Sequence, residues 1–195
     1  MRNLLVLAVA LALVPTLTSC AGRSLVKGQR TVVERSASKP DWVEKRSWEE
    51  DGKFFVVGTS GSVQDISVGE EIAEMNGKKL IASAVSETIR RQFDAVTTGN
   101  PSADRLGRAM TSVLSQRTDR VAVRGILPVE RYWERYEVVT DDGVAPGVEV
   151  SLKLAVAKVD FEAAKRQELQ AIAQQEQFRA DAEAKRILDQ IRSQP

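Results

Sequence analysis

The chain has 195 residues, of which 43% are hydrophobic and 28% charged, which is a globular rather than a disordered or fibrous composition. The formal net charge of +1 gives no sign of a nucleic-acid partner, which needs a clustered basic surface to neutralise phosphates. Histidine is absent, which removes the side chain best suited to proton transfer near neutral pH and the commonest metal ligand. The single cysteine excludes a disulfide within the chain.

Residues 1–19 have the layout of a secretory signal. Arg2 supplies the positive start, residues 4–14 are apolar without interruption, and Pro15 ends the run. A helix of that length is much shorter than the roughly 30 Å hydrocarbon core of a bilayer, so the run is typical of a signal that is removed. We therefore expect residues 1–19 to take no part in the mature fold.

Leu17-Thr18-Ser19-Cys20 resembles the lipobox of bacterial lipoproteins, an aliphatic residue and two small ones before a cysteine. The resemblance implies cleavage before Cys20 and lipid attachment at that cysteine, usually by two or three acyl chains. Each buried methylene contributes about 0.8 kcal/mol, so several chains anchor a protein almost permanently. Ala21, rather than aspartate, favours the outer membrane, facing the periplasm. The alternative is an ordinary secreted protein whose cysteine lies at the cleavage site by chance.

The mature chain divides into three parts by composition. Residues 20–39 are polar and mixed, which predicts a lipidated tether, although 30–34 also have the composition of a short edge strand. Residues 40–160 are expected to form the folded domain. Residues 161–195 are rich in Ala, Gln, Glu, Lys and Arg, which predicts a helix of about thirty residues. That helix is either a solvated tail or a partner-binding element, because one so polar needs support to be stable.

Within the domain, residues 53–58 (KFFVVG) predict a strand of aromatic and branched residues. A long helix is expected from about 68 to 96, with Asn76-Gly77 inside it as a candidate kink or break. Residues 102–115 predict a second, shorter helix. The apolar stripe of the long helix is formed by Ile81, Val85, Ile89, Phe93 and Val96.

Three later segments, residues 120–126, 131–139 and 148–156, have strand composition. The last alternates most clearly between apolar and mainly polar residues, so one of its faces is expected to pack on the helices. The order of elements predicts an α+β fold, with an antiparallel sheet of about four strands packed on one long and one short helix. The long C-terminal helix would follow this unit.

No residue pattern indicates an active site. Residues 58–62 (GTSGS) fail the G-x-S-x-G pattern of a nucleophile elbow, and no histidine exists to activate a serine. We therefore expect no enzyme, no cofactor, and no catalytic or metal-binding residues. Trp42, Trp48 and Trp133 are interpreted as core or interface anchors, with sugar stacking as the minority alternative.

Residues 40–43 (PDWV) and 54–61 (FFVVGTSG) resemble the small outer-membrane lipoproteins of the LPP type, which share a domain with the flagellar proteins FlgP and FlgT. The shared pattern is a Pro-x-Trp start, an aromatic strand ending in a glycine turn, a long alanine-bearing helix and returning strands. The resemblance covers roughly residues 40–160. It implies a non-enzymatic envelope protein, since some members build periplasmic disks or rings around the flagellar motor. Only Cys20, the lipid-attachment site, carries over from this pattern.

These observations predict a lipid-anchored protein with a structural or interaction role, with flagellar assembly or motility as one setting. Its expected partners are the membrane, through lipid on Cys20, and envelope proteins or further copies of itself. Two other functions stay open. One is a binding module for peptidoglycan or another envelope ligand, and the other is an accessory activator of an envelope enzyme or secretion machine that acts through the C-terminal helix.

Overall fold

The two longest strands of the chain form a hairpin at the centre of an antiparallel sheet. In the computed structural model, which describes residues 26–99, 101 and 103–193, the strand order is β1-β4-β5-β3-β2. The strands are β1 (Arg30–Arg35), β2 (Ser47–Glu50), β3 (Lys53–Thr59), β4 (Leu127–Thr140) and β5 (Gly143–Ala157). The predicted α+β class is confirmed, with five strands in place of about four.

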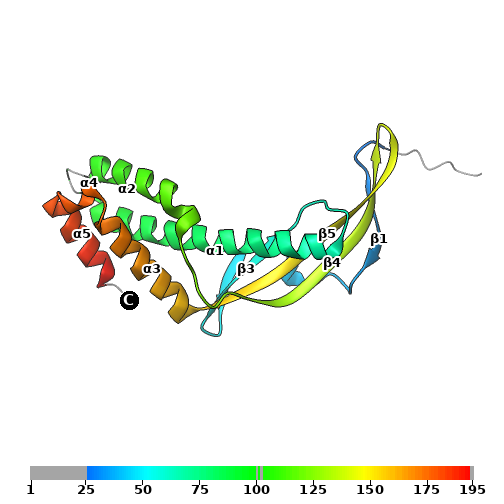
Figure 1. Cartoon of the computed structure of the whole chain (residues 1–195), viewed down its shortest axis with the longest axis horizontal. Coiled ribbons are helices and arrows are strands. Elements are labelled where there is room, and N and C mark those ends of the chain that lie inside the picture. Colours follow the sequence, from blue (N-terminus) through cyan, green and yellow to red (C-terminus); the bar gives the residue numbers. More distant parts are fainter. Residues whose placement is uncertain (1–25, 100, 102, 194–195) are drawn as a thin grey trace, which may run out of the picture.

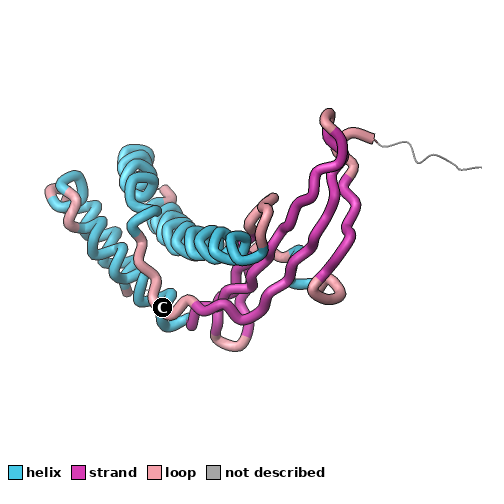
Figure 2. The backbone as a smooth tube through the Cα atoms, turned by 45° about the vertical axis from the view of Figure 1, so that its right-hand side comes forward, coloured by secondary structure: helices cyan, strands magenta, loops and turns pink. Residues whose placement is uncertain are grey.

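One face of the sheet is covered by the long helix α1 (Ile66–Thr97), as Figure 2 shows. The alternation expected in β5 causes this packing, because Val150, Leu152 and Leu154 all point to the helix side and are buried there. Asp65 begins the helix as its N-cap, accepting hydrogen bonds from the backbone N–H groups of Ser67 and Val68. The opposite side of the sheet is called the outer face below.

The molecule is elongated because α1 is longer than the sheet it covers (Figure 1). Its first half packs on β3 and β5, and its second half packs on the other helices. These are α2 (Ala103–Arg117), α3 (Lys158–Ala173), α4 (Glu176–Arg179) and α5 (Ala182–Arg192). Buried side chains from the sheet and from all five helices form one continuous core. The candidate break at Asn76-Gly77 is not present, since α1 continues through these residues.

The strand expected over residues 120–126 is wrong. The 3-10 helix η2 (Thr118–Arg120) is followed by an extended segment that pairs with no strand of the described chain. This segment connects the end of α2 to the start of β4, and it runs from the helical end of the molecule to the sheet (Figure 1). Val121, Val123 and Ile126 are half-buried against the core, which accounts for the alternation that resembled a strand.

The single long helix expected over residues 161–195 is also wrong. It is divided into α3, α4 and α5, which fold back on α1 and α2 rather than projecting as a tail (Figure 1). The break before α5 has a capping residue, because the carboxylate of Asp181 accepts from the backbone N–H of Ala184 at 3.0 Å. The same carboxylate pairs with Arg105 of α2 at 2.5 Å. Because α3, α4 and α5 fold back in this way, their apolar residues are core residues, among them Leu169, Ile172, Phe178, Ile187 and Ile191.

Part of the expected tether belongs to the sheet. Residues 30–35 form the edge strand β1, which pairs with β4 from Arg30 opposite Val138 to Arg35 opposite Glu134. The edge-strand alternative is therefore confirmed for this segment. Residues 20–25 lie outside the described part of the chain.

Candidate functional site

The outer face of the sheet carries a partly enclosed polar site. The register places Tyr132 of β4 opposite Ser151 of β5, and Glu134 opposite Glu149, so that all four side chains share this face. The 3-10 helix η1 (Asp41–Glu44) crosses it and buries Trp42 against Val57 and Tyr132.

A pocket of about 270 Å³ lies between η1 and the strands, and we call it the outer-face pocket. Its lining is mainly polar, and it is formed by Arg30, Lys39, Val43, Tyr132, Glu134, Glu149 and Ser151. The volume lies below the range of drug-sized ligand sites and would hold only a small molecule.

Charge pairs connect one side of the outer-face pocket. The Arg30 guanidinium donates to Glu149 at 2.5 Å and to Glu134 at 3.1 Å. Arg35 also pairs with Glu134 at 3.3 Å, and the Tyr132 hydroxyl donates to the same carboxylate at 2.6 Å. These contacts compensate charges inside the pocket, so the pairs stabilise the sheet edge as well as shaping the site.

Two hydroxyl groups in the pocket differ in what they can do. Burial, followed by the hydrogen bond to Glu134, raises the pKa of Tyr132 to about 12, so this phenol stays protonated at neutral pH. Ser151 is 4% exposed, and it lines the outer-face pocket beside Tyr132. The Ser151 hydroxyl can donate to or accept from a bound polar molecule, and Lys39, which pairs with Glu44 at 3.1 Å, can add a charged donor.

The three tryptophans do not meet in one groove. Trp42 is buried under η1, whereas Trp133 is half-buried at the core on the α1 side of the sheet, with Arg135 over its ring at 5.6 Å. Trp48 is half-exposed and stacks on Phe55 at 5.1 Å between ring centroids. The interpretation as a core anchor fits Trp42 best, because Trp48 and Trp133 are both partly exposed.

The glycine-rich turn after β3 has a structural contact. The Ser60 hydroxyl accepts from the backbone N–H of Val150 at 2.9 Å and donates to the carbonyl of Gly61 at 2.7 Å.

Within the described residues, no group of three or more metal-ligand side chains gathers, and no helix is both long and apolar enough to cross a membrane. Cys20, the predicted lipid-attachment site, lies outside the described residues.

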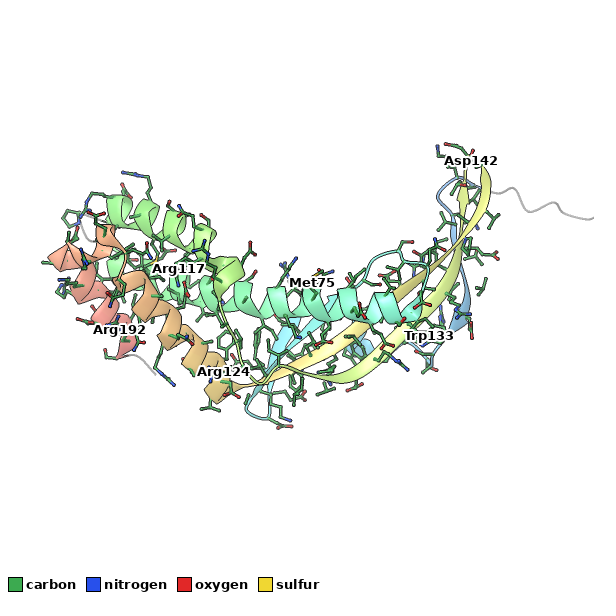
Figure 3. All side chains as sticks on the ribbon, viewed as in Figure 1. Met75, Arg117, Arg124, Trp133, Asp142 and Arg192 are labelled. Atoms are coloured by element: carbon green, nitrogen blue, oxygen red, sulfur yellow. The ribbon has the colours of Figure 1, made fainter. Side chains whose placement is uncertain are left out.

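A second surface lies along α1, on the flank that neither the sheet nor the other helices cover. Three open hollows of about 600, 490 and 430 Å³ follow it, between α1 and the chain from Thr118 to Arg131. Met75 stands on this flank, 48% exposed (Figure 3). Glu71, Glu74 and Lys78 surround it, and we call this surface the α1 flank.

Sequence reasoning missed the outer-face pocket. The alternation of residues 131–139 places Tyr132, Glu134 and Tyr136 on one face. What the sequence did not contain was the cross-strand register that adds Arg30, Glu149 and Ser151 to them.

No family model, no curated protein and no solved structure matches the chain. The fold defines the class of this chain as an elongated α+β protein.

Proposed function

We propose that this chain is a lipid-anchored protein of the bacterial cell envelope with a structural or interaction role. The signal layout and the lipobox ending in Cys20 support the anchor. The observation that carries the interaction role is the α1 flank, an uncovered side of the central helix followed by open hollows. Met75 and Val129, which are 48% and 45% exposed, line these hollows among charged side chains. Exposed apolar residues bordered by charge are typical of protein contact sites.

The flagellar setting comes from the resemblance to FlgP-related lipoproteins, and swimming tests it. A deletion strain is complemented with wild type or Cys20→Ser and followed in soft agar. Loss of swimming that wild type restores and Cys20→Ser does not restore supports an anchored motility role. Normal swimming of the deletion strain refutes the motility role and directs the work to envelope integrity.

The α1 flank is tested by one pair of surface variants in the same strain. Met75→Asp places a charge on the flank, whereas Val159→Asp places one on an apolar residue of α3 that is 69% exposed and lies outside it. Both changes leave the core intact, so both proteins should fold and accumulate. If Val159→Asp restores the wild-type phenotype to the deletion strain and Met75→Asp does not, the α1 flank is supported as a contact site. If both variants restore it equally, that role of the α1 flank is contradicted.

The outer-face pocket favours a second candidate function, the binding of a small polar envelope ligand such as a peptidoglycan fragment. The mainly polar lining of this pocket, which includes the buried residues Ser151 and Tyr132, is the observation behind it. An NMR titration of the full chain with N-acetylglucosamine or a soluble stem dipeptide, fragments small enough for this pocket, tests this function. Shifts confined to Ser151 and its neighbours, and lost in Ser151→Ala, support it, while the absence of shifts argues against it.

A further inference from the structure

The start of the described chain is fixed to one end of the molecule. The backbone N–H of Gly28 donates to the carbonyl of Val139 at 2.9 Å, and the Lys27 ammonium contacts Asp141 at 2.6 Å. Val139 lies near the end of β4 and Asp141 lies in the turn that joins β4 to β5. We call residues 26–28 together with 139–144 the hairpin tip (Figure 1).

The chain between Cys20 and the hairpin tip is short. Val26 follows Cys20 by six residues, which span at most about 20 Å even when fully extended. Had all of residues 20–39 been a tether, the same limit would have been about 65 Å. Incorporation of β1 into the sheet therefore removes most of the possible distance between a lipid on Cys20 and the fold.

The four shorter helices lie at the opposite end. α1 begins near the sheet and its 32 residues extend about 48 Å toward α2, α4 and α5. Asp181, next to Ala180, pairs with Arg105 near the start of α2, which places Ala180 at this far end. Asp142 and Met75 mark the hairpin tip and the middle of the molecule in Figure 3.

The hairpin tip has little attraction for lipid of its own. Asp141 and Asp142 outnumber Lys27 there, so the local charge is negative, and anionic lipid headgroups repel it. Val26 and Val144 are exposed but single, and a pair of valines buries too little apolar area to hold a protein on a bilayer. Proximity to the membrane must therefore come from the anchor.

We propose that the hairpin tip faces the lipid surface that holds the anchor, and that helices α2–α5 form the end presented away from the membrane. This inference rests on the proposed lipidation of Cys20. It deepens that function by assigning a membrane-side end and a partner-side end to the fold. The α1 flank connects the two ends.

The test is energy transfer from single sites on the lipidated full chain to acceptor-labelled lipids. Because Cys20 is the only cysteine and is blocked by acylation, Asp142→Cys, Met75→Cys and Ala180→Cys each carry one free thiol for a donor dye. All three positions are exposed. The purified lipoproteins are reconstituted in vesicles of phosphatidylethanolamine and phosphatidylglycerol, with acceptor in the headgroups.

Transfer should be several-fold stronger from position 142 than from position 180, with position 75 between them. A flexible Gly/Ser insertion between Leu25 and Val26 should weaken transfer from position 142, because it lengthens the tether. Equal transfer from the three sites means that the molecule lies flat, and a reversed order means that the helical end faces the lipid. Either result overturns the proposed orientation.

Failure of the anchor itself has a different signature. A chain that starts at position 20, with Cys20→Ser and Asp142→Cys and labelled at position 142, should remain in solution at any salt concentration. Persistent binding of that chain to vesicles would show an attraction that the anchor does not provide and would overturn the proposal. Absence of acyl chains on wild type, seen by mass spectrometry, would refute the proposed function before orientation is measured.

Discussion

Gly58 of β3 and Gly77 of α1 meet back to back, with no side chain between strand and helix. A Cβ atom on Gly58 would lie 2.0 Å from the carbonyl oxygen of Ala73 and 2.7 Å from the backbone nitrogen of Gly77. Both obstacles are backbone atoms of α1, so no rotamer change can relieve the contact. The closest approach of α1 to the sheet depends on these two glycines.

Gly58→Ala should therefore destabilise the protein, by about 2 kcal/mol on the scale of overpacked cores. Gly107→Ala is the matched control, because Gly107 lies in α2 and a Cβ there meets no atom within 4 Å. The control should stabilise the helix by about 0.5–1 kcal/mol, since alanine loses less backbone entropy. Urea unfolding monitored by circular dichroism measures both changes, and a neutral Gly58→Ala would contradict the close packing.

This contact explains one difference between sequence and structure. Asn76-Gly77 is a turn dipeptide in isolation, and so it marked a candidate break in the helix. In the fold the Asn76 side-chain amide donates to the carbonyl of Thr59 at 2.8 Å, and Gly77 admits the strand. Both residues thus serve the packing of α1 on β3, a long-range contact that local propensity does not contain.

Arg117 and Glu168 join α2 to α3 by a two-point ion pair. Arg117 Nε donates to Glu168 Oε1 at 2.6 Å and a terminal nitrogen donates to Oε2 at 3.2 Å, while the Glu168 side chain is 5% exposed. Arg117→Ala would leave that carboxylate buried without its partner, which typically costs about 3–5 kcal/mol. Figure 3 shows Arg117 among the helices.

The exposed pair Lys27–Asp141 is the control for this ion pair, because its side chains are 71% and 74% exposed. Lys27→Ala should cost less than about 1 kcal/mol, since water and salt screen such pairs. Chemical denaturation of the two variants compares the pairs directly. Similar losses in both would show that burial of Glu168 does not decide the energy.

Phe178 makes the short helix α4 part of the core. Its side chain is fully buried although α4 has only four residues. Phe178→Ala should destabilise the protein by about 3–5 kcal/mol, because the cavity cannot close completely. Val159→Ala, at a site that is 69% exposed, should change stability by less than about 0.5 kcal/mol. A small effect of Phe178→Ala would indicate that α4 and α5 detach easily from α1.

The same burial changes how the C-terminal region can be studied. Composition identified residues 161–195 as helical, and its apolar stripe is real, but only the contacts with α1 and α2 show where the chain turns. Removal of this region would expose the core residues that pack against Leu169, Ile172 and Ile187, and it would not simply delete an independent tail. Surface substitutions on α5 are therefore the suitable probes of an activator role.

Strands were predictable where their pattern was regular, and not where pairing alone defines them. β3 and β5 follow from aromatic and alternating residues, whereas the four residues of β2 form a strand because they pair with β3. Residues 120–126 show the reverse case, since they alternate like a strand but have no strand beside them. The outer-face pocket depends on this same information, because β1, β4 and β5 each supply part of its lining.

Tyr132 gives a prediction in pH. Burial, together with the Glu134 hydrogen bond, raises its pKa from 10.0 to about 12 in the fold. The protonated phenol is therefore the form that the fold favours, and this contribution to stability is complete below pH 10. It is lost as pH rises from 10 to about 12, because the unfolded chain releases its proton first.

Absorbance of tyrosinate measures this shift without interference in Tyr136→Phe, since the chain has two tyrosines. In that variant the remaining phenol should titrate near pH 12 while circular dichroism shows a folded chain, and near pH 10 in urea. Addition of Glu134→Gln should lower the folded midpoint, because it removes the carboxylate that accepts the hydrogen bond of the Tyr132 hydroxyl at 2.6 Å between the oxygens. The midpoint should stay above 10 because burial remains, and a folded midpoint at 10 would show that water reaches the Tyr132 hydroxyl.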